Sequence, residues 1–140
     1  MTRAPRGEAL VLRAAVAVLA LVPIGAGIDG MVLGAAMSGR DAVAPGPDAL
    51  ALDSHVRYLS GLLLAIGLGF WSTIPKLERQ GARFTLLTLL VVVGGLGRLG
   101  GVALAGPPPG PMLFGLVMEL GVTPALWLWR RRVARDVGTP

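Results

Sequence analysis

The sequence contains no cysteine and only one histidine. Without cysteine, the chain cannot form a disulfide scaffold, a zinc knuckle, an iron–sulfur site or a thiol nucleophile. A single histidine excludes a haem held by two histidines and disfavours a catalytic dyad. Charge is also scarce, because 15% of the 140 residues are charged whereas a soluble domain has about 25%. This composition does not suit an ordinary water-exposed surface.

What the sequence does have is long apolar runs. Hydrophobic residues make up 54% of the chain, and four stretches are apolar enough to be spans, at about residues 10–34, 55–74, 84–105 and 112–129. About 20 residues of helix cross the ~30 Å core of a bilayer, and helices satisfy their own backbone groups in lipid. We therefore predict an all-α fold, a four-transmembrane-helix bundle with up-down-up-down order in one membrane domain, residues 10–133.

The connections between the apolar stretches differ in character. Residues 35–54 form the one long loop, rich in small, proline and acidic residues, and we expect it outside the membrane. Residues 75–83 form a short basic turn, and residues 106–111 a stiff proline-rich one. Residues 1–9 and 134–140 are then cytoplasmic ends.

Ten of the thirteen lysines and arginines fall in three clusters that flank apolar stretches. The clusters are Arg3, Arg6 and Arg13; Lys76, Arg79 and Arg83; and Arg130, Arg131, Arg132 and Arg135. The outer side would carry only Arg40 and Arg57, so the positive-inside rule predicts that both termini are cytoplasmic (N-in/C-in). The net charge of +5 therefore indicates anionic lipid headgroups and no nucleic acid as partner.

A cleavable signal peptide is the alternative interpretation of the first stretch. Its arginines would be the n-region, Ala14–Val22 the apolar region, and Gly25–Gly27 a weak cleavage site. Apolar character continues through Met31–Leu33, which is longer than such a peptide needs.

Four short motifs, in order along the chain, resemble a known family. They are Leu21-Val22-Pro23-Ile24-x-x-Gly27, Asp53-Ser54-His55-x-Arg57-Tyr58-Leu59-x-Gly61, Gly94-Gly95-Leu96-x-Arg98-Leu99, and Met118-Glu119-Leu120-x-x-x-Pro124. Together they resemble the small bacterial membrane proteins grouped as domain of unknown function 4345, over about residues 10–133. The resemblance implies a four-helix integral protein of the bacterial cytoplasmic (inner) membrane, with no assigned reaction. Asp29 stands where that pattern has an aliphatic residue.

Ionisable residues inside the spans are the candidate ligand-binding residues: Asp29, Arg57, Arg98 and Glu119. Such residues are costly in lipid and normally have a partner. Arg98 lies seven residues before Ala105, and Glu119 seven residues after Met112, so both lie roughly 10 Å below the same end of a helical hairpin. This equal depth predicts an ion pair, structural or functional. Asp29 is a candidate partner of Arg57 or Arg98 at the same side.

Asp53 and His55 are secondary candidates. Asp53 and Arg57 are spaced i,i+4 and are most simply a local pair, whereas His55 lies about 200° from Arg57 around the helix and is expected to face headgroups or the loop. Two ligand-type residues are too few for zinc, and the glycine-rich run near Arg98 lacks the context of a phosphate loop. We expect no metal site, no cofactor and no catalytic residue.

Three classes of function remain open. The first is a binding protein whose polar cluster, in the outer half of the bundle, holds the headgroup of a lipid, quinone or other amphiphile. The second is a structural or accessory subunit of a larger membrane complex. The third is a small transporter or membrane enzyme, which the lack of nucleophiles and cofactor motifs disfavours. Transport would need several four-span protomers, so a homo-oligomer belongs with that alternative.

Overall fold

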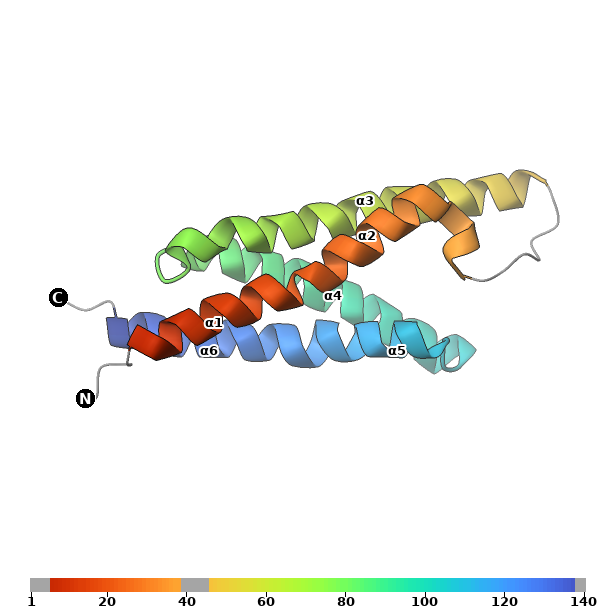
Figure 1. Ribbon diagram of the computed structural model, residues 1–140. Helices are drawn as coiled ribbons and strands as arrows, with labels where there is room; N and C mark the ends of the chain where they lie inside the picture. The colour runs from red at the N-terminus through yellow and green to blue at the C-terminus, as the bar shows by residue number, and fades with distance from the viewer. Residues whose placement is uncertain (1–5, 39–45, 138–140) are drawn as a thin grey trace. The chain divides into compact units, whose positions relative to one another are not determined.

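The computed structural model describes residues 6–38 and 46–137, and all regular structure among them is helical (Figure 1). The elements in chain order are α1 (Arg6–Leu19), α2 (Leu21–Leu33), η1 (Gly34–Ser38), α3 (Pro47–Thr73), η2 (Ile74–Lys76), α4 (Gly81–Ala105), α5 (Gly110–Val117), η3 (Met118–Val122) and α6 (Thr123–Val137). The elements η1 and η2 are 3₁₀ turns, and η3 is a π-helical turn.

Four helical stretches are long and apolar enough to cross a membrane: Gly7–Met37, Pro47–Lys76, Gly81–Ala105 and Gly110–Asp136. The shortest has 25 residues, which at 1.5 Å per residue is about 37 Å and exceeds a bilayer core. The predicted all-α fold with four spans is confirmed. The up-down order of the spans and the N-in/C-in orientation stay predictions.

The first span differs from the single helix expected over residues 10–34. It is interrupted at Ala20, between α1 and α2. The cause is Pro23, which has no N–H to donate to the carbonyl of Leu19. Hydrogen bonds from Ala20 N to Val16 O (3.0 Å) and from Ile24 N to Ala20 O (3.3 Å) carry the chain across the break.

The loop expected over residues 35–54 is also shorter in the structure. Residues 35–38 belong to η1, and α3 begins at Pro47 rather than His55. Proline suits the first turn of a helix, and Asp48 adds a favourable negative charge there. Hydropathy detects only the apolar part of this helix. Residues 39–45, with Arg40, lie outside the described residues, as do residues 1–5 with Arg3.

The last two spans extend beyond their expected ends. Helix α4 begins at Gly81 instead of residue 84, and α6 continues through the arginine-rich segment to Val137, whereas the fourth apolar stretch was expected to end at about residue 129. Arginine is a good helix former, so a loss of hydropathy there does not end the helix. Helix α4 ends at Ala105, and the following residue, Gly106, has a φ of 91°, a positive value that favours glycine.

The chain divides into two compact units, and each is described by itself. Unit 1 comprises Met1–Ala15 and Thr73–Pro140, and unit 2 comprises Val16–Ser72. In unit 1, α4 packs against η3 and α6. Trp127 Nε1 donates to Thr85 Oγ1 at 2.8 Å, whereas Arg98, later in α4, meets Glu119, earlier in the last stretch. Helix α4 and the stretch from α5 to α6 therefore run in opposite directions.

In unit 2, α2 and α3 approach closely at small residues. A Cβ added to Gly27 would lie 2.7 Å from Leu64 N and 2.8 Å from Ser60 O, so only glycine fits against the α3 backbone. A Cβ on Gly67 would likewise meet Ile24 at 2.7 Å. Small residues at a helix contact let backbones approach within a membrane, and this contact places Arg57 beside the end of α2.

Candidate functional site

Arg98 of α4 and Glu119 of η3 form a bidentate ion pair in unit 1. Arg98 Nε donates to Glu119 Oε2 and Nη2 donates to Oε1, each at 3.0 Å. Parallel guanidinium–carboxylate bonds of this kind are strong and fix the orientation of both groups. The Arg98 side chain is 35% exposed and the Glu119 side chain 18%. The pair expected from equal depth in the hairpin is therefore present.

A π-helical turn positions Glu119. Residues Met118–Val122 form this turn immediately before Pro124. The carbonyl of Met118 accepts two hydrogen bonds from Thr123. One comes from its backbone N–H and the other, at 2.8 Å, from its Oγ1 hydroxyl. Pro124 cannot donate to the preceding turn, and π turns of this kind are frequent at functional sites. Pro124 belongs to a motif recognised in the sequence, whereas the role of Thr123 was not predicted; its position next to the proline was the available signal.

Glycines make room for the ion pair. A Cβ on Gly95 would lie 2.8 Å from Glu119 Cβ and 2.8 Å from Leu120 Cδ2, so α4 and η3 touch there. A Cβ on Gly115 would stand 3.8 Å from Arg98 Cζ, which is ordinary van der Waals contact. In contrast, a Cβ on four other α4 glycines would meet no described atom within 4 Å: Gly94, Gly97, Gly100 and Gly101. Arg98 thus has open space beside it.

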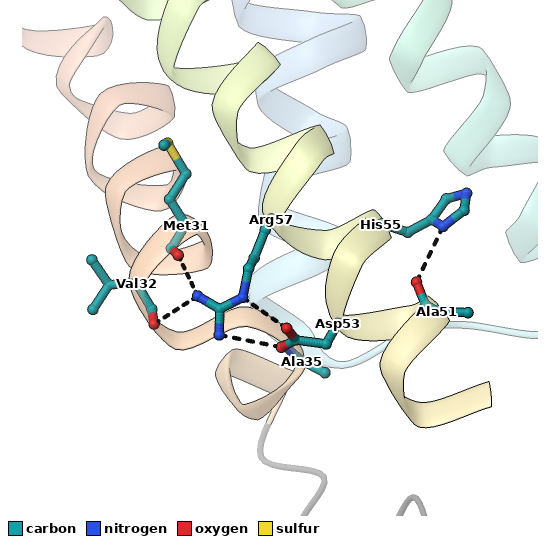
Figure 2. A network of polar contacts seen from close by, with 7 residues as sticks. All are labelled: Met31, Val32, Ala35, Ala51, Asp53, His55 and Arg57. Carbon is teal, nitrogen blue, oxygen red and sulfur yellow. Dashed lines mark hydrogen bonds and ion pairs between the residues drawn. The ribbon is translucent and has the colours of Figure 1, made fainter. Parts of the chain in front are cut away.

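Arg57 belongs to a separate network in unit 2 (Figure 2). Its Nε donates to Asp53 Oδ2 at 2.7 Å, which is the predicted i,i+4 pair. Its Nη1 donates to Met31 O at 2.6 Å and to Val32 O at 3.1 Å. These carbonyls lie in the last turn of α2, where they lack helical partners. Asp53 Oδ1 accepts the N–H of Ala35 at 3.0 Å, so the network fixes the chain where α2 ends.

The other two candidates take no part in these two networks. His55 is exposed, points away from the Arg57 guanidinium in Figure 2, and its Nδ1 lies 3.1 Å from Ala51 O. Asp29 is exposed and forms no hydrogen bond or ion pair within the described ranges. Arg57, one of its two expected partners, is paired with Asp53 instead. Residues 6–38 and 46–137 contain no group of three metal-ligating side chains.

A further polar cluster, not predicted from the sequence, lies in unit 1 around the turn between α3 and α4. Glu78 accepts hydrogen bonds from Arg13 Nε (3.2 Å) and Nη2 (2.9 Å). Arg130, which is 7% exposed, donates from Nε to Leu77 O at 2.9 Å and from Nη2 to Glu78 O at 2.6 Å. Every residue has a backbone carbonyl, so the sequence does not show which carbonyls accept hydrogen bonds. Only the clusters of basic residues could be recognised from the sequence.

The charge environment stabilises the ionised form of Glu78. Burial acts to raise the pKa of its carboxyl, but the hydrogen bonds from Arg13 and from its own backbone, with the charges of Arg13 and Arg130, act in the opposite direction and prevail. The pKa of Glu78 is consequently below its ordinary value. The carboxylate is therefore charged at neutral pH and forms a structural bridge between α1 and the turn after α3.

No curated protein and no solved structure matches the chain significantly. A family model matches residues 11–130, which is most of the chain and includes both arginine networks. With four apolar helices and this match, the chain belongs to the family described as Domain of unknown function (DUF4345).

Proposed function

We propose that this protein resides in a bacterial cytoplasmic membrane and binds the headgroup of an amphiphile at the Arg98–Glu119 pair. One observation carries the proposal. Glu119 engages Nε and Nη2 of Arg98, which leaves Nη1 without a hydrogen-bond partner among the described residues, on a side chain that is 35% exposed. An unused donor within an apolar span favours an acceptor from outside the chain.

The charge of the pair indicates which headgroup suits it. Glu119 balances the charge of Arg98, so the site has no net charge to attract a further anion. A neutral acceptor, such as a quinone or ester carbonyl, fits the remaining N–H better than a phosphate does. Glu119 then acts as a positioning residue, since its two bonds at 3.0 Å fix the direction of Nη1.

The open glycines provide the space for the apolar part of the ligand. Gly94 and Gly101 lie four residues before and three residues after Arg98, which places them on the same helical face. Neither position meets a neighbouring atom within 4 Å, even with an added Cβ. A hydrocarbon or isoprenoid chain lying there would cover α4 beside the guanidinium.

The test is native mass spectrometry of the full chain, extracted in mild detergent without prolonged delipidation. The wild type should retain a small amphiphile, identified by its mass after extraction. Gly101→Leu fills the open space and should remove the ligand while the ion pair stays intact. Gly25→Leu is the matched control, because Gly25 also meets nothing within 4 Å but lies in α2.

Replacement of the arginine gives a second comparison. Arg98→Gln should abolish the adduct, whereas Arg57→Gln should preserve it, because the Nη1 of Arg57 is already used by two carbonyls. Equal retention in all variants, or no adduct in the wild type, contradicts the proposal. A stoichiometric protein partner in place of a small molecule would assign the chain to the accessory subunits.

A further inference from the structure

The cations around the turn between α3 and α4 fall into two groups that the sequence does not distinguish. The first group is bound within the protein. Arg13 forms a bidentate pair with Glu78, with Nη2 at 2.9 Å from both carboxylate oxygens. Arg130 is buried on the carbonyls of Leu77 and Glu78. Both guanidinium groups are bound by acceptors of the protein itself, the carboxylate of Glu78 for Arg13 and two backbone carbonyls for Arg130, so we assign them a structural role.

The second group is exposed and forms no ion pair with any residue that the structure describes. We call it the exposed basic surface, and it consists of Lys76, Arg79, Arg83, Arg131 and Arg135. The carboxylates nearby are largely occupied. Glu78 is paired with Arg13. Glu8 accepts a hydrogen bond from Trp129 Nε1 at 3.0 Å, and its carboxylate lies 4.0 Å from Arg132 Nε. Asp136 alone cannot neutralise five cations.

Contacts in unit 1 place the two basic segments at the same end. Arg130 reaches the turn at Leu77 and Glu78, and a Cβ on Gly81 would lie 2.8 Å from its Nη1. The cations of the turn and those of α6 therefore lie at the same end of unit 1. Trp127 adds an interfacial side chain, because its ring lies 4.6 Å from Arg131 Cζ and its Nε1 is anchored on Thr85.

We propose that the exposed basic surface binds the phosphate groups of anionic phospholipids in the adjacent leaflet. Cations next to a membrane span are attracted to anionic headgroups, and a tryptophan with one polar edge favours the headgroup level. The occupant is a lipid rather than a nucleic acid because the cations directly adjoin apolar spans. This inference does not depend on the site at Arg98, which favours a neutral acceptor.

The experiment uses the full chain in nanodiscs of phosphatidylcholine with a minor share of phosphatidylglycerol. Native mass spectrometry then measures the ratio of the two lipids that remain bound after the disc is removed. The wild type should enrich phosphatidylglycerol, and a variant with all five residues replaced by glutamine should lose this enrichment at least ~10-fold. A variant that exchanges lysine and arginine at the five positions should largely retain it.

Two single substitutions control for removal of charge and for misfolding. Arg131→Gln should reduce phosphatidylglycerol enrichment without lowering the unfolding midpoint. Arg13→Gln removes one cation from the same end but should lower the midpoint and leave enrichment by the folded protein nearly unchanged. If the fivefold variant does not fold, these two still decide the question. Equal enrichment in the wild type and in Arg131→Gln, or in a folded fivefold variant, would overturn the proposal.

Discussion

Alanine at either Arg98 or Glu119 leaves the other charge in an apolar span without its partner. The wild-type pair has two charge-assisted hydrogen bonds of 3.0 Å. Each single substitution removes both bonds and retains the desolvation cost of the surviving group. The double substitution removes the cost together with the bonds, so we expect it to be less harmful than the sum of the two single ones.

The exposure of the two side chains sets the expected magnitude. Removal of one partner from a fully buried pair costs about 3–5 kcal/mol. Here the Arg98 and Glu119 side chains are 35% and 18% exposed, and a long arginine can carry its charge toward the interface. We therefore expect about 2–3 kcal/mol for each single alanine variant and a coupling energy of at least ~1 kcal/mol.

The assay is reversible unfolding by sodium dodecyl sulfate in mixed micelles, followed by circular dichroism, for the wild type and the three variants. A control cycle combines Glu119→Ala with Arg13→Ala, since Arg13 bonds to Glu78 and shares no partner with Glu119. That control should be additive within ~0.5 kcal/mol. If the Arg98–Glu119 cycle is equally additive, the two residues do not interact and the proposed binding site loses its geometric basis.

Three further predictions concern topology, packing and pH. A reporter fused after Pro140 should be active only in the cytoplasm, because the cation bias places both termini there, and activity outside would reverse the topology. Gly95→Ala should destabilise the protein by about 1–3 kcal/mol, since its Cβ would lie 2.8 Å from atoms of the facing helix, whereas Gly115→Ala, with its nearest atom at 3.8 Å, should be neutral or stabilising by up to ~1 kcal/mol in the same assay. The lowered pKa of Glu78 contributes stability above its unfolded-state value and loses it as pH falls through the folded value, so Glu78→Gln should flatten the acidic limb of a plot of thermal midpoint against pH; an unchanged limb would show that Arg13 does not hold this carboxylate.

The helices were predictable because lipid imposes a simple rule on sequence. A span must be long, apolar and helical, and four stretches met that condition and are helices in the structure. The exact ends were not predictable from hydropathy, because a helix continues wherever its backbone bonds and caps allow. Pro47 begins α3 within the segment expected to be a loop, and the arginines of α6 continue that helix beyond the last apolar stretch. Pro23 gave the one visible signal for the break at Ala20.

The ion pairs were predictable only where geometry follows from chain register. Arg98 and Glu119 are equally far from a short turn, and Asp53 and Arg57 are i,i+4 on one helix, so both pairs could be derived by counting. Asp29 could not be placed in this way, because its depth alone names no partner. The carbonyls that accept Arg57 were also invisible, since every residue has one and only the tertiary contact selects Met31 and Val32.

Tertiary packing also divides the arginines of the basic clusters into two kinds. Arg130 and Arg131 are adjacent in sequence, yet Arg130 is buried on backbone carbonyls and Arg131 is exposed over Trp127. Consecutive residues on a helix point about 100° apart. The packing of α6 against the turn therefore decides which arginine is buried and which stays exposed. The number of lysines and arginines used to predict topology is therefore larger than the number free to contact lipid headgroups. Among the residues that the structure describes, we therefore assign ligand contacts to the Arg98 guanidinium in the spans and to the five cations of the exposed basic surface.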